Sequence, residues 1–256
     1  MHPVVQNKAS RLYLFLGTFF VANALIAECI GVKIFSLEKT LGISQFHFNF
    51  FGIKDLSFQM TAGVLLWPLE FVMTDIINEY FGPKGVRRIS VVAVSLIGYA
   101  FIMFYSAMRL APADFWIGVN ANNGVPDMQH AYSAIFGQGM WIIVGSLSAF
   151  MISQLVDVFV FHWVKKKTGD KMMWLRSTGS TVVSQFIDSF IVLFIAFYIG
   201  QGWDFRLVMA ICLINYIYKF IMAVVLTPVL YIVHIFIERF LGKNLADEMK
   251  QAAMSK

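Results

Sequence analysis

The chain has 256 residues, of which 59% are hydrophobic and only 14% are charged, and its formal net charge is +5. A soluble domain carries about 25% charged residues, so this composition excludes a water-soluble protein. Apolar runs long enough to cross roughly 30 Å of hydrocarbon as helices recur along the sequence. They lack the two-residue alternation of a membrane β-barrel. We therefore expect an all-α integral membrane protein with one transmembrane domain over residues 1–256.

Six apolar segments are expected to span the membrane as a compact bundle. The Gly82-Pro83 pair is a strong helix stop and should end the second of them. The Phe-rich residues 35–57 are expected to form a short helix in the membrane interface, and residues 109–131 are expected to form a loop. A charged amphipathic tail follows the last span. The expected spans are about 12–34, 58–81, 89–108, 132–162, 178–198 and 207–236.

Positive charge is distributed unequally between the two sides that these spans define. Fourteen Lys and Arg residues fall on the side of the N-terminus and five on the other, while Lys219 falls inside the sixth span. Cytoplasmic loops of membrane proteins are enriched in Lys and Arg. The asymmetry therefore predicts that both termini are cytoplasmic. These cations are interpreted as membrane anchors, and no nucleic-acid partner is expected.

A short pattern occurs in both the fourth and the fifth segment. Residues 152–157 read Ile-Ser-Gln-Leu-Val-Asp and residues 183–188 read Val-Ser-Gln-Phe-Ile-Asp, an offset of 31 residues. Successive spans run in opposite directions, so the two copies are expected to face each other antiparallel. Transporters often place binding sites at such repeat interfaces. We favour the interpretation that the two Ser-Gln-Asp sets serve the same function over the interpretation that they descend from a duplicated segment.

Ionisable residues inside the spans are the main candidates for function, since each costs roughly 2.5–3.5 kcal/mol at the centre of a membrane helix. Glu70 and Thr74 share one face of the second segment, and Asp75 and Asn78 share a neighbouring face. Two alternatives stay open for Glu70: it binds substrate, or it forms a buried pair with Lys219. Glu79 lies nearer the end of the segment, and a contact with Arg87 or Arg88 is the simpler reading.

Other polar side chains in the spans divide between function and structure. Ser153 and Ser184 are interpreted mainly as hydrogen-bonding contacts between helices, whereas Asp157 and Asp188 are favoured as functional residues. Trp67 or a Tyr is a candidate to stack on an aromatic substrate. The complete set of candidate substrate-binding residues is Asn23, Trp67, Glu70, Thr74, Asp75, Asn78, Gln154, Asp157, Gln185, Asp188, Asn215 and Lys219.

No catalytic or metal-binding signature is present. The sequence lacks a Gly-rich phosphate loop, a His-Glu-x-x-His pattern and a nucleophile elbow. Cys29 and Cys212 lie in separate apolar segments without a second Cys or a His at ligand spacing. We therefore expect no enzyme activity, no metal and no cofactor.

Three stretches resemble a known family. Residues 67–82, Trp-Pro-Leu-Glu-Phe-Val-Met-Thr-Asp-Ile-Ile-Asn-Glu-Tyr-Phe-Gly, look like the signature second helix of the queuosine precursor transporters, also called the vitamin uptake transporter family. Residues 23–32 and 177–188 resemble two further signatures, and the likeness covers roughly residues 15–235.

The resemblance implies import of a 7-deazaguanine, such as preQ0 or preQ1, for the tRNA nucleoside queuosine. It also implies a six-helix fold like the substrate-binding subunits of energy-coupling-factor vitamin transporters, in a bacterial inner membrane. The preferred deazaguanine, the coupling ion, the role of residues 35–57 and the oligomeric state, a homo-oligomer included, stay open. Two alternative functions remain: an intramembrane enzyme with paired carboxylates, and a binding subunit that needs an ATPase module.

Overall fold

The computed structural model describes residues 7–50, 52–137, 140–168 and 172–254, and it is an α-helical membrane protein. Five helices of this part are long and apolar enough to cross a membrane. They are α2 (Lys8–Ile30), α4 (Trp67–Met108), α7 (Met140–Thr168), α8 (Met173–Leu193) and α9 (Phe205–Leu241). α8 continues as a π-helix, η3 (Phe194–Ile199), so its span extends to residue 199.

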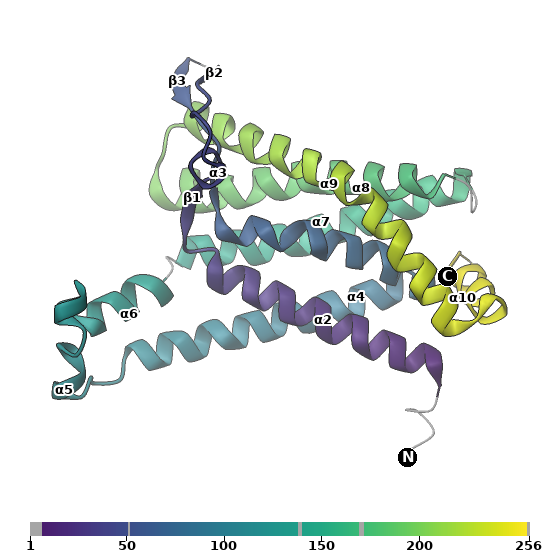
Figure 1. Ribbon diagram of the computed structural model, residues 1–256, viewed down its shortest axis with the longest axis horizontal. Helices are drawn as coiled ribbons and strands as arrows, with labels where there is room; N and C mark the ends of the chain where they lie inside the picture. The colour runs from purple at the N-terminus through teal and green to yellow at the C-terminus, as the bar shows by residue number, and fades with distance from the viewer. Residues whose placement is uncertain (1–6, 51, 138–139, 169–171, 255–256) are drawn as a thin grey trace.

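Helix α4 is two spans joined by a sharp reversal at Gly82. The backbone of Gly82 has φ 71° and ψ −176°, a region that is essentially open to glycine only. Pro83 follows, and its fixed φ suits the first turn of the next helix. Figure 1 shows the two halves of α4 running in opposite directions. The described helices therefore make six passes, as predicted, and the expected stop at Gly82-Pro83 is confirmed.

Several of the predicted span boundaries are wrong. The second span begins at Trp67, because residues 59–61 form strand β4 (Gln59–Thr61) and η1 (Ala62–Leu65) follows as a 3₁₀ helix. β4 pairs antiparallel with β1 (Ile34–Ser36), which ends the first helix earlier than expected. The predicted span 132–162 is divided between α6 (Met128–Phe136), which ends at Gly137, and α7.

The connection over residues 35–57 is only partly the interfacial helix that we expected. Its helix is the single turn α3 (Leu37–Leu41), and the Phe-rich part forms a hairpin of β2 (Phe48–Phe50) and β3 (Ile53–Leu56). Phe, Ile and other bulky side chains favour strands, and Gly52 with φ 81° lies between the two strands. The expected loop 109–131 contains α5 (Asp114–Ile117), the 3₁₀ turn η2 (Ala121–Asn123) and the start of α6.

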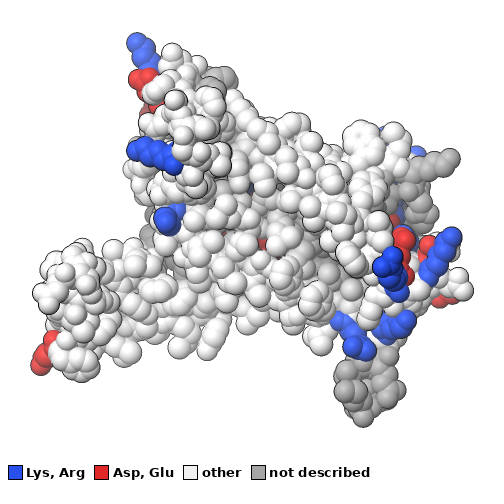
Figure 2. Space-filling model, viewed as in Figure 1, with Lys and Arg blue, Asp and Glu red and all other residues white. Residues whose placement is uncertain are grey.

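Both described ends of the chain lie at one end of the bundle. Figure 1 places the N-terminus, the C-terminus and α10 (Lys243–Met254) together, opposite the β-hairpin and α5. Lys and Arg gather at this end in Figure 2, while the middle of the visible face is almost free of charge. This distribution fits a bundle whose centre lies in hydrocarbon and whose ends lie in water.

The main hydrophobic core lies between α2, α4, α7 and α9. Phe20, Ile76, Phe150 and Leu230, one from each of these helices, are at most 2% exposed. Many other large apolar side chains face outward, as lipid-facing residues do. This arrangement leaves the inner faces of α4, α7, α8 and α9 as the place for buried polar groups.

Candidate functional site

Helices α7 and α8 are joined by two reciprocal hydrogen bonds between the repeated Ser-Gln-Asp sets. Ser153 Oγ on α7 donates to Asp188 Oδ1 on α8 at 3.3 Å, and Ser184 Oγ on α8 donates to Asp157 Oδ1 on α7 at 3.0 Å. All four side chains are buried. The two copies therefore face each other antiparallel, as predicted, and the interpretation of both serines as contacts between helices is confirmed.

Lys219 on α9 is paired with one of these aspartates. Its Nζ lies 2.6 Å from Asp188 Oδ2, and both side chains are largely buried. The alternative in which Lys219 pairs with Glu70 is therefore wrong for this conformation. An ammonium group has three donors, so Lys219 has donors left for a further acceptor.

A second polar contact zone lies between the first half of α4 and α7. Thr74 Oγ1 donates to Gln154 Oε1 at 3.0 Å, and Asn78 Oδ1 lies 2.9 Å from His162 Nε2. Residues four apart lie on the same helical face, so Glu70 belongs to this face as well. It is fully buried, and neither carboxylate oxygen has a hydrogen-bond partner among the described residues.

Glu79 forms a buried ion pair at the end of the bundle near the termini. Lys165 Nζ on α7 lies 2.9 Å from Glu79 Oε2, and the two side chains are 1% and 2% exposed. The expected contact with Arg87 or Arg88 is therefore replaced by one with Lys165. The first half of α4 is thus tied to α7 by polar contacts at successive turns.

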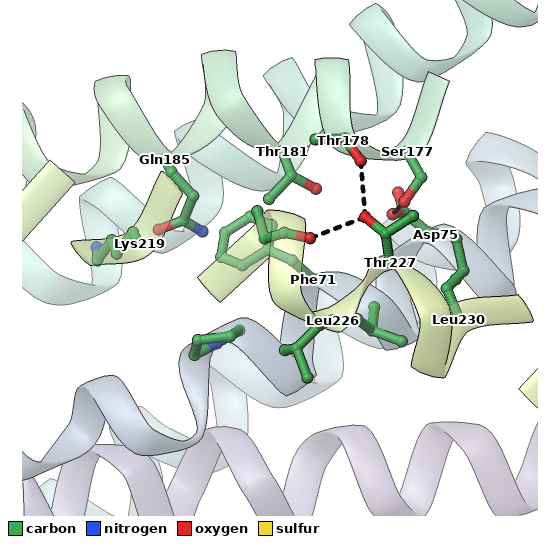
Figure 3. Close-up of a pocket in the computed structure, with 13 residues that line it drawn as sticks. Phe71, Asp75, Ser177, Thr178, Thr181, Gln185, Lys219, Leu226, Thr227 and Leu230 are labelled. Carbon is green, nitrogen blue, oxygen red and sulfur yellow. Dashed lines mark hydrogen bonds between the residues drawn. The ribbon is translucent and has the colours of Figure 1, made fainter. Parts of the chain in front are cut away.

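A narrow cleft with about 370 Å³ of empty space, counting the part open to the outside, lies between α4, α8 and α9. Figure 3 shows α8 and α9 side chains directed toward it. Its lining residues are Pro68, Phe71, Val72, Asp75, Ser177, Thr178, Thr181, Gln185, Lys219, Ala223, Leu226, Thr227 and Leu230.

The two ends of the cleft are polar and its middle is mostly apolar. Gln185 and Lys219 lie together at one end, while Asp75 and Ser177 lie at the other (Figure 3). Ser177 Oγ donates a hydrogen bond to Asp75 Oδ2. Gln185 is 3% exposed, and neither its Nε2 nor its Oε1 has a described partner. A buried amide without partners is costly, so this end of the cleft is suited to a polar ligand.

Three of the predicted site residues line the cleft: Asp75, Gln185 and Lys219. Asp188 adjoins it through the Lys219 ion pair. The other predicted residues are not among those that line it: Asn23, Trp67, Glu70, Thr74, Asn78, Gln154, Asp157 and Asn215.

Several of these non-lining residues have visible structural contacts. Asn23 Nδ2 donates to the Phe19 carbonyl at 2.8 Å, and Asn215 Nδ2 donates to the Ile211 carbonyl at 2.9 Å, each within its own helix. The ring of Trp67 packs on Phe150, with 5.6 Å between the ring centroids. These three side chains are therefore held by contacts within the bundle.

The sequence analysis missed the other ten cleft residues, among them Phe71, Ser177, Thr178, Thr181 and Thr227. A signal was present on α8, because Ser177, Thr181 and Gln185 are spaced four apart and so form one polar stripe. Phe71 gave no signal, since an apolar residue in a membrane span looks the same whether it faces lipid or a ligand. Among the described residues, no three His, Cys, Asp or Glu side chains converge as a metal site.

Comparisons with known proteins agree with one another. The family model described as "Putative vitamin uptake transporter" matches residues 61–233. The chain is 31% identical over 176 residues to a "Probable queuosine precursor transporter" of Bacillus subtilis, covering 67% of this chain and 70% of that protein. It is 25% identical over 199 residues to a "Probable queuosine precursor transporter" of Haemophilus influenzae, covering 77% and 74%. No solved structure matches significantly.

Proposed function

The chain belongs to the putative vitamin uptake transporter family, and on this premise we propose that it imports a queuosine precursor of the 7-deazaguanine class, such as preQ0 or preQ1. It is a membrane transporter and not an enzyme. Both relatives described above are named as probable queuosine precursor transporters. The cleft between α4, α8 and α9 is the proposed binding site.

The groups at the Gln185–Lys219 end of the cleft suit the edge of a guanine-like base. Such an edge presents two N–H donors and one carbonyl acceptor. The Gln185 amide both donates and accepts, and the Lys219 ammonium donates to a carbonyl. The Asp75 carboxylate, at the other end of the cleft, accepts from a donor on another part of the substrate. Phe71 on the α4 wall takes the stacking role that we expected of Trp67, since aromatic faces pack well on planar rings.

The Gln185 amide is the observation that carries this proposal. It is buried in the cleft wall with both polar atoms unpartnered, and a base edge would satisfy both at once. A site built to hydrogen-bond a substrate rejects analogues that lack those groups, because its own buried groups are then left unpaired. We therefore expect selectivity for bases that carry a donor beside an acceptor.

The proposed orientation of the chain in the membrane rests on the distribution of positive charge. Both described ends of the chain lie where Lys and Arg gather (Figure 2), which supports cytoplasmic termini in a bacterial inner membrane. The likeness to energy-coupling-factor binding subunits, the absence of a nucleic-acid partner and the oligomeric state stay predictions.

The test is a binding titration of the purified protein with preQ0, preQ1, queuine and guanine. We expect at least one deazaguanine to bind, and Gln185→Leu to weaken binding by about tenfold or more, which corresponds to about 1.4 kcal/mol. Gln201→Leu is the control, because Gln201 is exposed outside the cleft. Equal binding by the Gln185 variant and the wild type would remove the cleft from the proposal, and no binding of any deazaguanine would remove the substrate.

A further inference from the structure

The two Ser-Asp contacts between α7 and α8 are equivalent in sequence but differ in charge. Asp188 accepts from Ser153 through Oδ1 and from the Lys219 ammonium through Oδ2. Asp157 accepts from Ser184 through Oδ1, while its Oδ2 has no described hydrogen-bond partner. One member of the pair therefore has a cation and the other has none.

Asp157 is placed where an ionised carboxylate is expensive. Its side chain is 0% exposed, and it is not among the residues that line the cleft. Ser180, one turn before Ser184 on α8, is the other hydroxyl near this carboxyl group, and its own described hydrogen bond goes to the Ser177 carbonyl at 3.0 Å. Charge inside a membrane bundle has to be paired or neutralised.

We propose that Asp157 binds the coupling proton of transport. In the repeated pattern this proton takes the place beside Asp157 that the Lys219 ammonium takes beside Asp188. In this conformation the group is the neutral acid. During each cycle it accepts one H⁺ from the outer water, returns to the carboxylate when the H⁺ leaves to the inner water, and is unchanged overall. This inference rests on the proposed function, since it assigns the energy source of that import.

A proton is favoured over the other cations for reasons of geometry. Sodium needs about six oxygen ligands at once, whereas the hydroxyl groups described near the Asp157 carboxyl group are those of Ser184 and Ser180. A substrate ammonium would have to arrive through the cleft, which Asp157 does not line. A proton needs only one oxygen atom and a brief chain of water or hydroxyl groups.

Other titratable and charged groups surround α7, and several of them already form ion pairs or hydrogen bonds. Lys219 lies on Asp188, Lys165 lies on Glu79, and Ser177 donates to Asp75. Glu70 on α4 is another buried carboxyl group of this region with unpartnered oxygens among the described residues, and Glu28 on α2 accepts a hydrogen bond from Ser146 of α7. The remaining titratable and charged residues on α7 and on the elements that pack against it are Tyr80, Lys84, Arg87, Arg88, Tyr99, Tyr105, His162, Lys166, Lys167, Arg176, Tyr198, Lys243, Asp247, Glu248 and Lys250.

The test uses full-length protein in proteoliposomes, with radiolabelled preQ1 and preQ0 as probes. Wild type should accumulate the probe when the outside is more acidic, and a protonophore should abolish accumulation. Asp157→Asn mimics the protonated acid and can keep the Ser184 contact. Its affinity for the probe should be within about twofold of that of wild type, and it should still exchange labelled for unlabelled probe. The amount of probe accumulated under a pH gradient should fall at least tenfold.

Asp204→Asn is the matched control, because Asp204 is exposed and caps the start of α9; it should accumulate the probe like wild type. Glu70→Gln should remain dependent on the pH gradient. Accumulation by Asp157→Asn that still follows the pH gradient would overturn the inference, as would loss of that dependence in Glu70→Gln alone or accumulation driven by sodium. Failure of wild type to bind either probe is a different result, because it refutes the proposed substrate.

Discussion

Asp188 Oδ2 and Lys219 Nζ lie 2.6 Å apart and form an ion pair that joins α8 to α9 beside the cleft. Removing one partner of a buried pair typically costs 3–5 kcal/mol, because the other charge remains buried without compensation. We therefore expect Asp188→Asn to lower the melting temperature markedly. The double variant Asp188→Asn/Lys219→Met should recover much of that loss.

The binding readout separates the roles of the two residues in this pair. Lys219 lines the cleft, so the double variant should regain stability without regaining affinity for a deazaguanine. Thermal melting and ligand titration of the wild type, both single variants and the double variant provide the measurement. Full affinity in the double variant would show that Lys219 serves the helix contact alone.

Gly82 is expected to be intolerant of a side chain. Its φ of 71° is in a region where other residues cost about 1–3 kcal/mol, and an added Cβ would lie 3.3 Å from the carbonyl oxygen of Ala253 on α10. Gly82→Ala should therefore lower the melting temperature. Gly98→Ala in the second half of α4 is the matched control, since an added Cβ there meets nothing within 4 Å, and it should leave stability unchanged or raise it slightly.

Glu38 holds the connection between the first two spans. Its Oε1 accepts from the Phe58 N–H at 2.8 Å and its Oε2 accepts from Ser36 Oγ at 3.0 Å. Burial by itself raises the pKa of Glu38, but hydrogen bonds from the backbone of Phe58, Glu38 and Phe46 and from the Ser36 side chain outweigh it and lower the pKa below the ordinary value of 4.5. The ionised form is therefore favoured by folding of this segment.

This shift gives the segment a defined response to acid. A lowered pKa in the folded state means that the stabilisation is complete above pH 4.5 and is lost as the pH falls below that value. Amide exchange in residues 34–61 should accelerate, relative to the intrinsic rate, in that range. Glu38→Gln should show about tenfold faster exchange already at neutral pH and no such acid step, whereas the exposed Glu248→Gln on α10 should behave like wild type.

The predicted orientation is tested with reporters. A phosphatase that is active only outside the cytoplasm should be inactive when fused at the C-terminus and active when fused after Gly124, in the turn at the opposite end of the bundle. The physical reason is the excess of Lys and Arg at the end where the chain termini lie. Activity of the C-terminal fusion would overturn the predicted orientation of the chain.

The features of the fold that follow from one helix at a time were predictable from the sequence. The reversal at Gly82-Pro83 and the antiparallel facing of the two Ser-Gln-Asp sets depend on local chain chemistry and on alternating helix direction. The hairpin of β2 and β3 was not predicted, because the Phe-rich run was interpreted as the apolar face of an interfacial helix and the strand preference of Phe and Ile was not considered. The break between α6 and α7 was missed, although the sequence Gly137-Gln138-Gly139 interrupts the apolar run there.

Features that depend on the packing of several helices were harder to predict. Sequence spacing places Lys219 on a face of α9 but does not show which carboxylate pairs with it. In the structure the partner is Asp188 and not Glu70. The same limit explains why Thr74 and Gln154 were read as ligands although they bond to each other. Polar residues in a span signal burial, and only the assembled bundle shows what they face.

The reciprocal Ser-Asp contacts have a consequence for motion. Because each copy supplies one donor and one acceptor, a slide of α8 along α7 in either direction breaks both hydrogen bonds together. Such a slide would expose two buried carboxyl groups to unfavourable surroundings at the same moment. Helices α7 and α8 should therefore move together as one rigid body. The motion that opens the cleft to one side of the membrane and then to the other should occur where this rigid body contacts α4 and α9.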